Sequence, residues 1–152
     1  MRISIGSDHR GVELKAALAK ELAASGHQVS DEGPCDSADS VDYPDIGALV
    51  GHKVSQQDAD RGILICGSGV GMAITANKFR GVRAAVVGDE KLARLCRQHN
   101  DVNVLCLSGD EPARAAAPAI VTAWLETEFE GGRHARRVDK ISEIEHSRGV
   151  CS

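Results

Sequence analysis

The sequence lacks the features that mark several special classes of protein. No apolar run approaches the roughly 18 residues that a membrane-spanning helix needs, and the first residues, MRISIGSDHR, contain no signal-peptide core. The net charge of −4 gives no general attraction to nucleic acids or anionic membranes. The five cysteines are scattered and form no C-x-x-C pair, which argues against a disulfide framework or a zinc knuckle. We therefore expect a cytoplasmic protein without nucleic-acid or membrane partners.

The rest of the composition is that of an ordinary globular protein. Of the 152 residues, 42% are hydrophobic and 26% are charged. The chain is long enough to bury a core, and no repeat, low-complexity tract or linker divides it. We expect residues 1–152 to form one domain.

Segments with strand character alternate with helical segments along the chain. RGILICG is a continuous apolar run, which is typical of a strand buried on both faces. The pattern predicts strands over residues 2–8, 27–33, 61–67, 81–88 and 102–109. It predicts helices over residues 11–25, 44–55, 89–99, 113–126 and about 136–148, and one that begins near residue 70. This order predicts an α/β fold, a Rossmann-like three-layer α/β/α sandwich with a five-stranded parallel sheet.

The candidate site lies in GILICGSGVGMAITANK, where Cys66 ends a strand and three glycines follow. Ligands bind beyond the carboxyl ends of the strands in such sheets. The glycine spacing fits neither a dinucleotide fingerprint nor a Walker A loop. A glycine turn that leads into a helix presents backbone N–H groups to an anion, either a phosphate or an oxyanion formed during a reaction. A tight turn without a ligand is the alternative.

Cys66 is the candidate reactive group of this loop. A thiol beside a helix N-terminus is favoured as the thiolate, which is the reactive form. The alternative is a small buried core residue, the commoner fate of a free cysteine. We interpret the remaining cysteines in that way or as inert surface thiols: Cys35, Cys96, Cys106 and Cys151.

Three further polar clusters have both a functional and an unremarkable interpretation. They are Asp8 and His9 after the first strand, His99, Asn100 and Asp101 in RQHND, and Arg133, Arg136 and Arg137 in GGRHARR. RQHND precedes the fifth strand and so belongs at the end of the sheet opposite to Cys66. Arg133 and Arg137 are i,i+4 neighbours that could bind one phosphate together. Taken singly, the clusters are also explained as a turn, a helix end and a solvated basic face.

Together, five motifs in this order resemble the ribose/galactose isomerase family over essentially the whole chain: SDHRG, DYP, ICGSGVGMAITANK, RQHND and GGRHARRV. The resemblance implies an aldose–ketose isomerase that interconverts ribose 5-phosphate and ribulose 5-phosphate through a cis-enediolate, without a metal or cofactor. Other substrates remain open, namely galactose 6-phosphate, allose 6-phosphate or a tetrose phosphate. A branch of the family uses a glutamate where this chain has Met72, so Cys66 places the chain in the cysteine branch.

The resemblance also implies a role for each site residue. Cys66 is the base that moves the proton, Ser68 relays a proton, and Asp8 and His99 open the sugar ring. The remaining residues bind substrate: the loop amides of Gly67, Gly69, Val70 and Gly71 as an anion hole, Tyr43 and Asn100 as lining, and His9, Arg133 and Arg137 as phosphate ligands. The family builds this site between two subunits, so we expect a homodimer, alone or in a tetramer, with the last helix (about 136–148) at the interface.

One position departs from the family pattern. The family usually carries a phosphate-binding arginine after the fifth strand, where this chain has Asp110 in LSGDEPAR. Asp110 could be the N-cap of the helix that begins near Pro112, or the phosphate could lie elsewhere, with Arg114 as the replacement cation. Aspartate before Glu-Pro is a good helix start, which favours the N-cap.

Two functions outside the family also fit single motifs. Cys66 and His99 could serve a thiol hydrolase, which would form a covalent adduct that an isomerase does not form. The glycine loop could belong to a non-catalytic phosphate- or nucleotide-binding module, which would tolerate Cys66→Ser.

Overall fold

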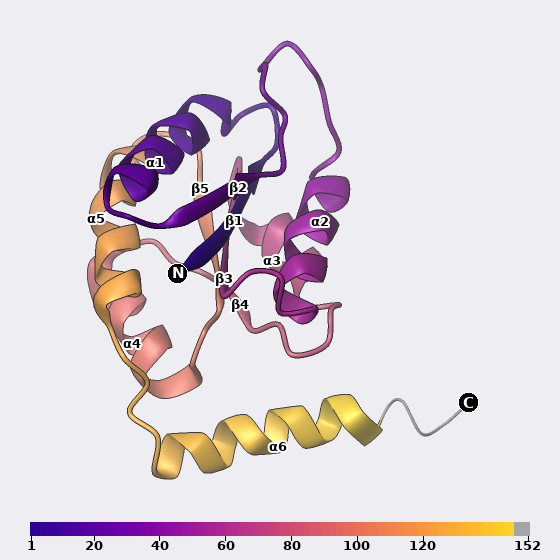
Figure 1. Ribbon diagram of the computed structural model, residues 1–152, viewed down its shortest axis with the longest axis vertical. Coiled ribbons are helices and arrows are strands. Elements are labelled where there is room, and N and C mark those ends of the chain that lie inside the picture. The colour runs from indigo at the N-terminus through magenta and orange to yellow at the C-terminus, as the bar shows by residue number, and fades with distance from the viewer. Residues whose placement is uncertain (148–152) are drawn as a thin grey trace.

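The computed structural model describes residues 1–147 (Figure 1). The strands are β1 (Arg2–Ser7), β2 (Gln28–Asp31), β3 (Arg61–Cys66), β4 (Ala84–Val86) and β5 (Val104–Ser108). The helices are α1 (Val12–Ala24), α2 (Tyr43–Ser55), α3 (Val70–Ala76), α4 (Glu90–Asn100), α5 (Ala113–Glu126) and α6 (Arg133–Ser147). None of these helices is long and apolar enough to cross a bilayer.

All five strands are parallel and follow the order β2-β1-β3-β5-β4. Helices cover both faces of the sheet, which confirms the predicted α/β fold with a five-stranded parallel sheet (Figure 1). After β1 the chain crosses to one face of the sheet, and after β3 it crosses to the other, because α1 and α3 pack on opposite faces. The carboxyl ends of β1 and β3 therefore form a switch point, where sheets of this kind bind ligands.

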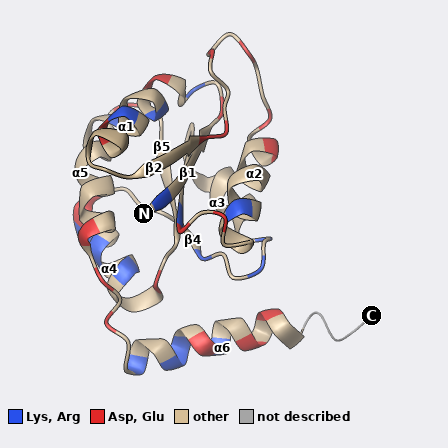
Figure 2. Ribbon diagram, in the orientation of Figure 1, with Lys and Arg blue, Asp and Glu red and all other residues tan. Residues whose placement is uncertain are grey.

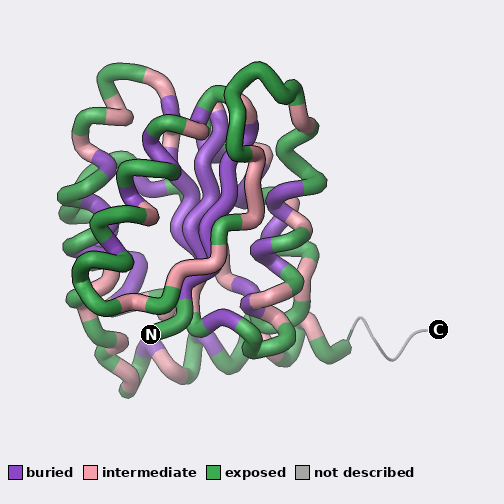
Figure 3. The backbone as a smooth tube through the Cα atoms, turned by 45° about the horizontal axis from the view of Figure 1, so that its top comes forward, coloured by how far each residue is buried: buried purple, intermediate pink, exposed green. Residues whose placement is uncertain are grey.

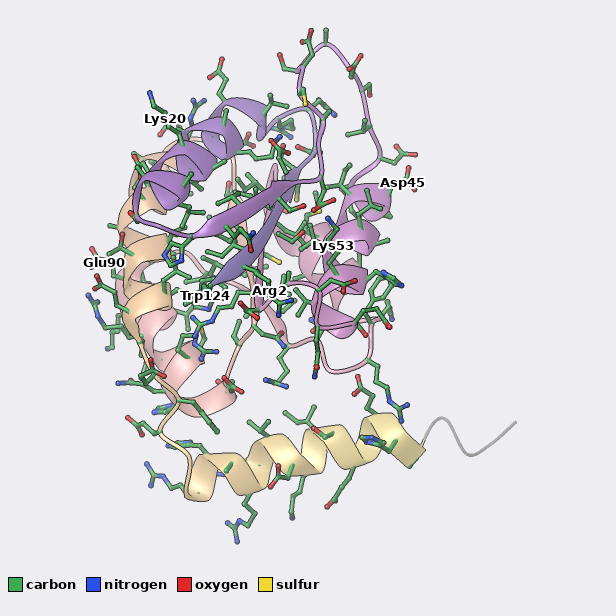
Figure 4. All side chains as sticks on the ribbon, viewed as in Figure 1. Arg2, Lys20, Asp45, Lys53, Glu90 and Trp124 are labelled. Atoms are coloured by element: carbon green, nitrogen blue, oxygen red, sulfur yellow. The ribbon has the colours of Figure 1, made fainter. Side chains whose placement is uncertain are left out.

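Alternation along the strands decides which face each side chain occupies. On β3, Ile63 and Ile65 pack with α1, α4 and α5, whereas Leu64 and Cys66 pack with α2 and α3. Trp124 of α5 is fully buried on the first face (Figure 4). The Arg61 guanidinium lies over its ring, 5.0 Å from the centroid. Figure 3 shows the result, a buried sheet enclosed by helices whose outer sides are exposed.

β2 and β5 are shorter than the predicted ranges, and β4 and α6 differ most from the sequence prediction. β4 is shorter than residues 81–88, because it is an edge strand that pairs only with β5. α6 begins at Arg133 rather than near residue 136, directly after two glycines with positive φ, Gly131 and Gly132. Residues 148–152, with the expected helix end at Arg148 and with Cys151, lie outside the described part of the chain.

Candidate active site

The loop after β3 holds the Cys66 sulfur against its own backbone. Gly69 has φ +79°, and a Cβ at this position would lie 3.2 Å from the carbonyl carbon and oxygen of Leu107 on β5. Only glycine meets both conditions without strain. The turn directs the Gly69 N–H at the Cys66 Sγ, 3.1 Å away.

Two contacts fasten this loop to the end of β5. The Ser108 hydroxyl donates to the Gly67 carbonyl at 2.6 Å, and the Gly109 N–H donates to the Cys66 carbonyl at 2.8 Å. The loop is therefore tied to the neighbouring strand on the side where β1 and β3 also end. A site built on such a fixed support keeps its geometry without the substrate.

A pocket of about 500 Å³ opens at these carboxyl ends. The sequence-predicted residues that line it are Asp8, Tyr43, Cys66, Gly67, Ser68, Val70 and Gly71. Three other residues line it: Asp110, for which the sequence favoured a helix-cap role, and Arg10 and Ile74, which sequence reasoning missed. Arg10 belongs to the motif SDHRG at the carboxyl end of the first strand. This position was a signal that could have identified it as a pocket residue.

Asp8 and His9 follow β1 and are held differently. Asp8 is buried, and its Oδ1 accepts a hydrogen bond from the Arg10 N–H at 2.9 Å. Its backbone N–H donates to the Ile65 carbonyl, which ties this turn to β3. The His9 Nδ1 is buried and has no hydrogen-bond partner among the described residues, although His9 does not line the pocket.

The other cysteines confirm the interpretation given to them, where the structure describes them. Cys96 and Cys106 are buried in the core, and Cys35 is exposed. Burial raises the pKa of the Cys96 thiol to about 11, and burial, with Cys66 as a smaller cause, raises the pKa of the Cys106 thiol. Within residues 1–147, Cys66 is the cysteine that lines the pocket.

The second group of predicted residues lies at the other end of the molecule. His99 and Asn100 end α4, where the strands begin, and Arg133 and Arg137 stand at the start of α6 (Figure 1). The ribbon of Figure 2 is blue, for Lys and Arg, at this end of α6. None of these residues lines the pocket with Cys66. Within one chain, the structure therefore brings together only part of the predicted site.

His99 packs against the first turn of α6. Its ring stacks on the His134 ring, with centroids 4.2 Å apart and planes inclined by 8°. Burial, followed by the neighbouring His99 and Arg133, lowers the pKa of His134. The lowered pKa favours the neutral His134 ring, which stacks on His99 with less charge repulsion than an imidazolium would.

The same histidines form a group with metal-ligand character. Ligand atoms of His99, Glu130 and His134 lie within 4.8 Å of one another. An imidazole lone pair lies in the plane of its ring, and these two rings are stacked nearly parallel. The rings cannot both direct a lone pair at one ion in this arrangement, so the group does not fit a metal site.

The predicted N-cap role of Asp110 is wrong. The N-cap of α5 is Pro112, with no side-chain capping bond. The Asp110 Oδ2 instead accepts a hydrogen bond from Arg10 Nη2 at 2.5 Å. A guanidinium within reach is a stronger partner for a carboxylate than a backbone N–H. The alternative cation, Arg114, binds Glu13 at 2.8 Å and does not line the pocket.

Comparisons with known proteins agree with this architecture. The sequence profile described as Ribose/Galactose Isomerase matches residues 3–141. A solved structure of Clostridium thermocellum ribose-5-phosphate isomerase B is 48% identical, with a TM-score of 0.93 over 97% of this chain and 99% of that chain. The Mycoplasma genitalium enzyme of this name, solved with bound ribulose 5-phosphate, is 46% identical, with a TM-score of 0.91 over 95% of this chain and 96% of that chain.

A curated relative extends the similarity. Ribose-5-phosphate isomerase B of Escherichia coli is 44% identical over 147 residues, which are 97% of this chain and 98% of that protein. The resemblance expected from the five motifs is thereby confirmed. The profile match and these identities over nearly full length show that the chain belongs to the ribose/galactose isomerase family.

Proposed function

We propose that the chain interconverts ribose 5-phosphate and ribulose 5-phosphate through a cis-enediolate. As a member of its family it is a sugar-phosphate aldose–ketose isomerase. The observation that carries the proposal is the Cys66 sulfur, which lines the pocket beside the backbone amides of the glycine loop. Enolisation needs one base next to the substrate carbon and donors directed at the oxygen on which charge develops.

In this mechanism Cys66 removes the proton from C2 of the open-chain aldose and returns it to C1. The electron pair of the broken C–H bond forms the enediolate, and its charge develops on the C1 oxygen. The amides of Gly67, Gly69, Val70 and Gly71 form the hole for this oxyanion. Ser68 is exposed at the loop, where its hydroxyl accepts the Val70 N–H at 3.3 Å, and it relays the proton between the two oxygens.

Ring opening is assigned to Asp8 and His99, which lie at opposite ends of one chain. The described lining of the pocket holds two carboxylates, Asp8 and Asp110, and one guanidinium, Arg10. This lining is net negative, although the substrate phosphate carries a charge near −2. Further cations must therefore come from another source.

A second subunit supplies the missing groups in our proposal. A two-fold axis places the His99–Asn100 end of one chain over the Cys66 pocket of its partner, with Arg133 and Arg137 beside the phosphate. His9, whose Nδ1 has no hydrogen-bond partner among the described residues, is assigned to the same phosphate. The α6 helix also exposes two apolar side chains, Ile141 (51%) and Ile144 (57%), which an interface would cover. Dimers of this kind could pair further into a tetramer.

Purified protein assayed on phosphorylated tetroses, pentoses and hexoses tests the function. We expect the highest kcat/KM on the ribose 5-phosphate–ribulose 5-phosphate pair, because the motifs resemble the ribose enzymes over the whole chain. Preference for galactose 6-phosphate, allose 6-phosphate or a tetrose phosphate would assign a different substrate to the same chemistry. A trapped covalent adduct, or binding without turnover, would contradict the isomerase.

Gly71→Ala is expected to lower kcat/KM about 10- to 100-fold, the size of effect that small displacements of site groups produce. A Cβ on residue 71 would lie 2.5 Å from Cε2 of Tyr43, so the ring must move. Tyr43 is 43% exposed, which lets the ring swing outward while the fold is kept. Gly88→Ala is the matched control, because a Cβ there meets nothing within 4 Å. A Gly71→Ala effect that persists undiminished in a Tyr43→Ala background would contradict this explanation.

A further inference from the structure

Arg10 and Asp110 face each other at the edge of the Cys66 pocket. Arg10 follows β1 and Asp110 follows β5, so the pair joins two loops that are 100 residues apart in sequence. Both side chains line the pocket, and both remain about half exposed, at 55% and 44%. Exposed ion pairs of this kind add little to stability. The pair is therefore better explained by what it does to the pocket than by what it does to the fold.

The guanidinium of Arg10 lies over Gly67. A Cβ on residue 67 would stand 2.8 Å from Arg10 Nη1 and 3.2 Å from Cζ. The absence of a side chain at Gly67 thus leaves room for the guanidinium beside the loop that follows Cys66. Asp110 holds the group through Nη2, and a guanidinium carries five N–H donors, so donors remain for a second anion.

We infer that Arg10 binds the phosphate of the substrate. The inference rests on the proposed function and names a residue for it. Arg10 and Asp110 lie at the ends of β1 and β5 beside the Cys66 loop, and the ion pair holds the guanidinium at the pocket. Of the described residues that line the pocket, Arg10 is the single cation. A guanidinium that bridges a carboxylate and a phosphate satisfies both with charge-assisted hydrogen bonds.

The competing explanation is that Arg10 only neutralises Asp110. Both explanations predict that Arg10→Ala weakens substrate binding, because the variant leaves a bare carboxylate in the pocket. They differ for the double variant Arg10→Ala with Asp110→Asn, which removes both charges. If Arg10 contacts the phosphate, the double variant stays weak. If Arg10 only screens Asp110, the double variant recovers.

The experiment measures KM for ribose 5-phosphate and the competitive inhibition constant of inorganic phosphate. We expect Arg10→Ala to raise both about 10- to 100-fold, the loss expected for a hydrogen-bonded charge pair. We expect kcat of Arg10→Ala to change little. The double variant should keep at least half of the increase in KM and in the inhibition constant, measured on a logarithmic scale. Arg114→Ala is the matched control, since it removes another half-exposed arginine paired to a carboxylate, outside the pocket.

Recovery of the double variant to wild-type values, or an unchanged inhibition constant in Arg10→Ala, would overturn the inference. Calorimetric titration with inorganic phosphate on the wild type and on Arg10→Ala separates this result from the proposed function. If ribose 5-phosphate proves not to be a substrate, phosphate binding still reports on Arg10. If Arg10→Ala binds phosphate as the wild type does while ribose 5-phosphate is turned over, only the inference fails.

Discussion

Cys66→Ala is expected to lower kcat about 10²- to 10⁴-fold, the contribution of a positioned general base. Alanine removes the sulfur and its contact with the Gly69 N–H, but the two bonds to β5 through the Cys66 and Gly67 carbonyls still hold the glycine loop. Substrate binding should therefore be nearly kept. Isomerisation of ribose 5-phosphate under saturating conditions gives kcat, and inhibition by inorganic phosphate reports on binding.

Two controls make this result specific. Cys35→Ala removes an exposed thiol elsewhere and should leave turnover unchanged. In heavy water, deuterium uptake at C1 of the ribulose 5-phosphate formed from ribose 5-phosphate follows the proton transfer itself, and it should fall with kcat in Cys66→Ala. A Cys66→Ala protein that keeps near-normal kcat would assign the base to another residue.

Mixing a Cys66→Ala protein with a His99→Asn protein is expected to restore activity that neither has alone. In a dimer with shared sites, each hybrid combines an intact Cys66 from one subunit with an intact His99 from the other at one of its two sites. Random exchange makes half of the dimers hybrids, so the mixture should reach roughly a quarter of wild-type activity. The activity of the mixture should therefore rise far above that of either variant alone, because both variants are nearly inactive.

Subunit exchange must be verified for this test, for example by native mass spectrometry of differently labelled subunits. Mixing Cys66→Ala with Cys66→Ser is the control, because no hybrid of these two contains an intact Cys66. No recovery in a mixture that has exchanged would place Cys66 and His99 in one subunit's site, contrary to their separation in the described chain.

The sequence alone was sufficient for the features that depend on local pattern. The apolar run that ends at Cys66 fixes a buried strand, and the glycines that follow fix the turn, so the pocket could be located before the structure was known. Alternation of strands and helices was likewise enough for the parallel sheet. These signals are contained within a few consecutive residues.

Features that join distant segments could not be predicted in this way. Asp110 has a good local environment for a helix cap, yet its partner is Arg10, which only the folded sheet brings near. The stacking of His99 on His134 depends in the same way on where α6 docks against α4. For Asp110, the ion pair with the distant Arg10 outweighed the local preference for a helix cap. For His99, no local sequence pattern indicated the stacking on His134.

The contact of Gly69 with β5 has a consequence for how this chain can vary. Gly69 is fitted against the backbone of Leu107, not against its side chain. Replacement of Leu107 by another apolar residue leaves that backbone surface in place. A slip of β5 by one residue would disturb that surface. Ile65 pairs with Leu107 and Cys66 pairs with Ser108, and after a slip each side chain of β5 would point to the opposite face of the sheet. Exchange of Leu107 for another apolar residue is therefore tolerable at the loop after β3, whereas an insertion or deletion in β5 is not.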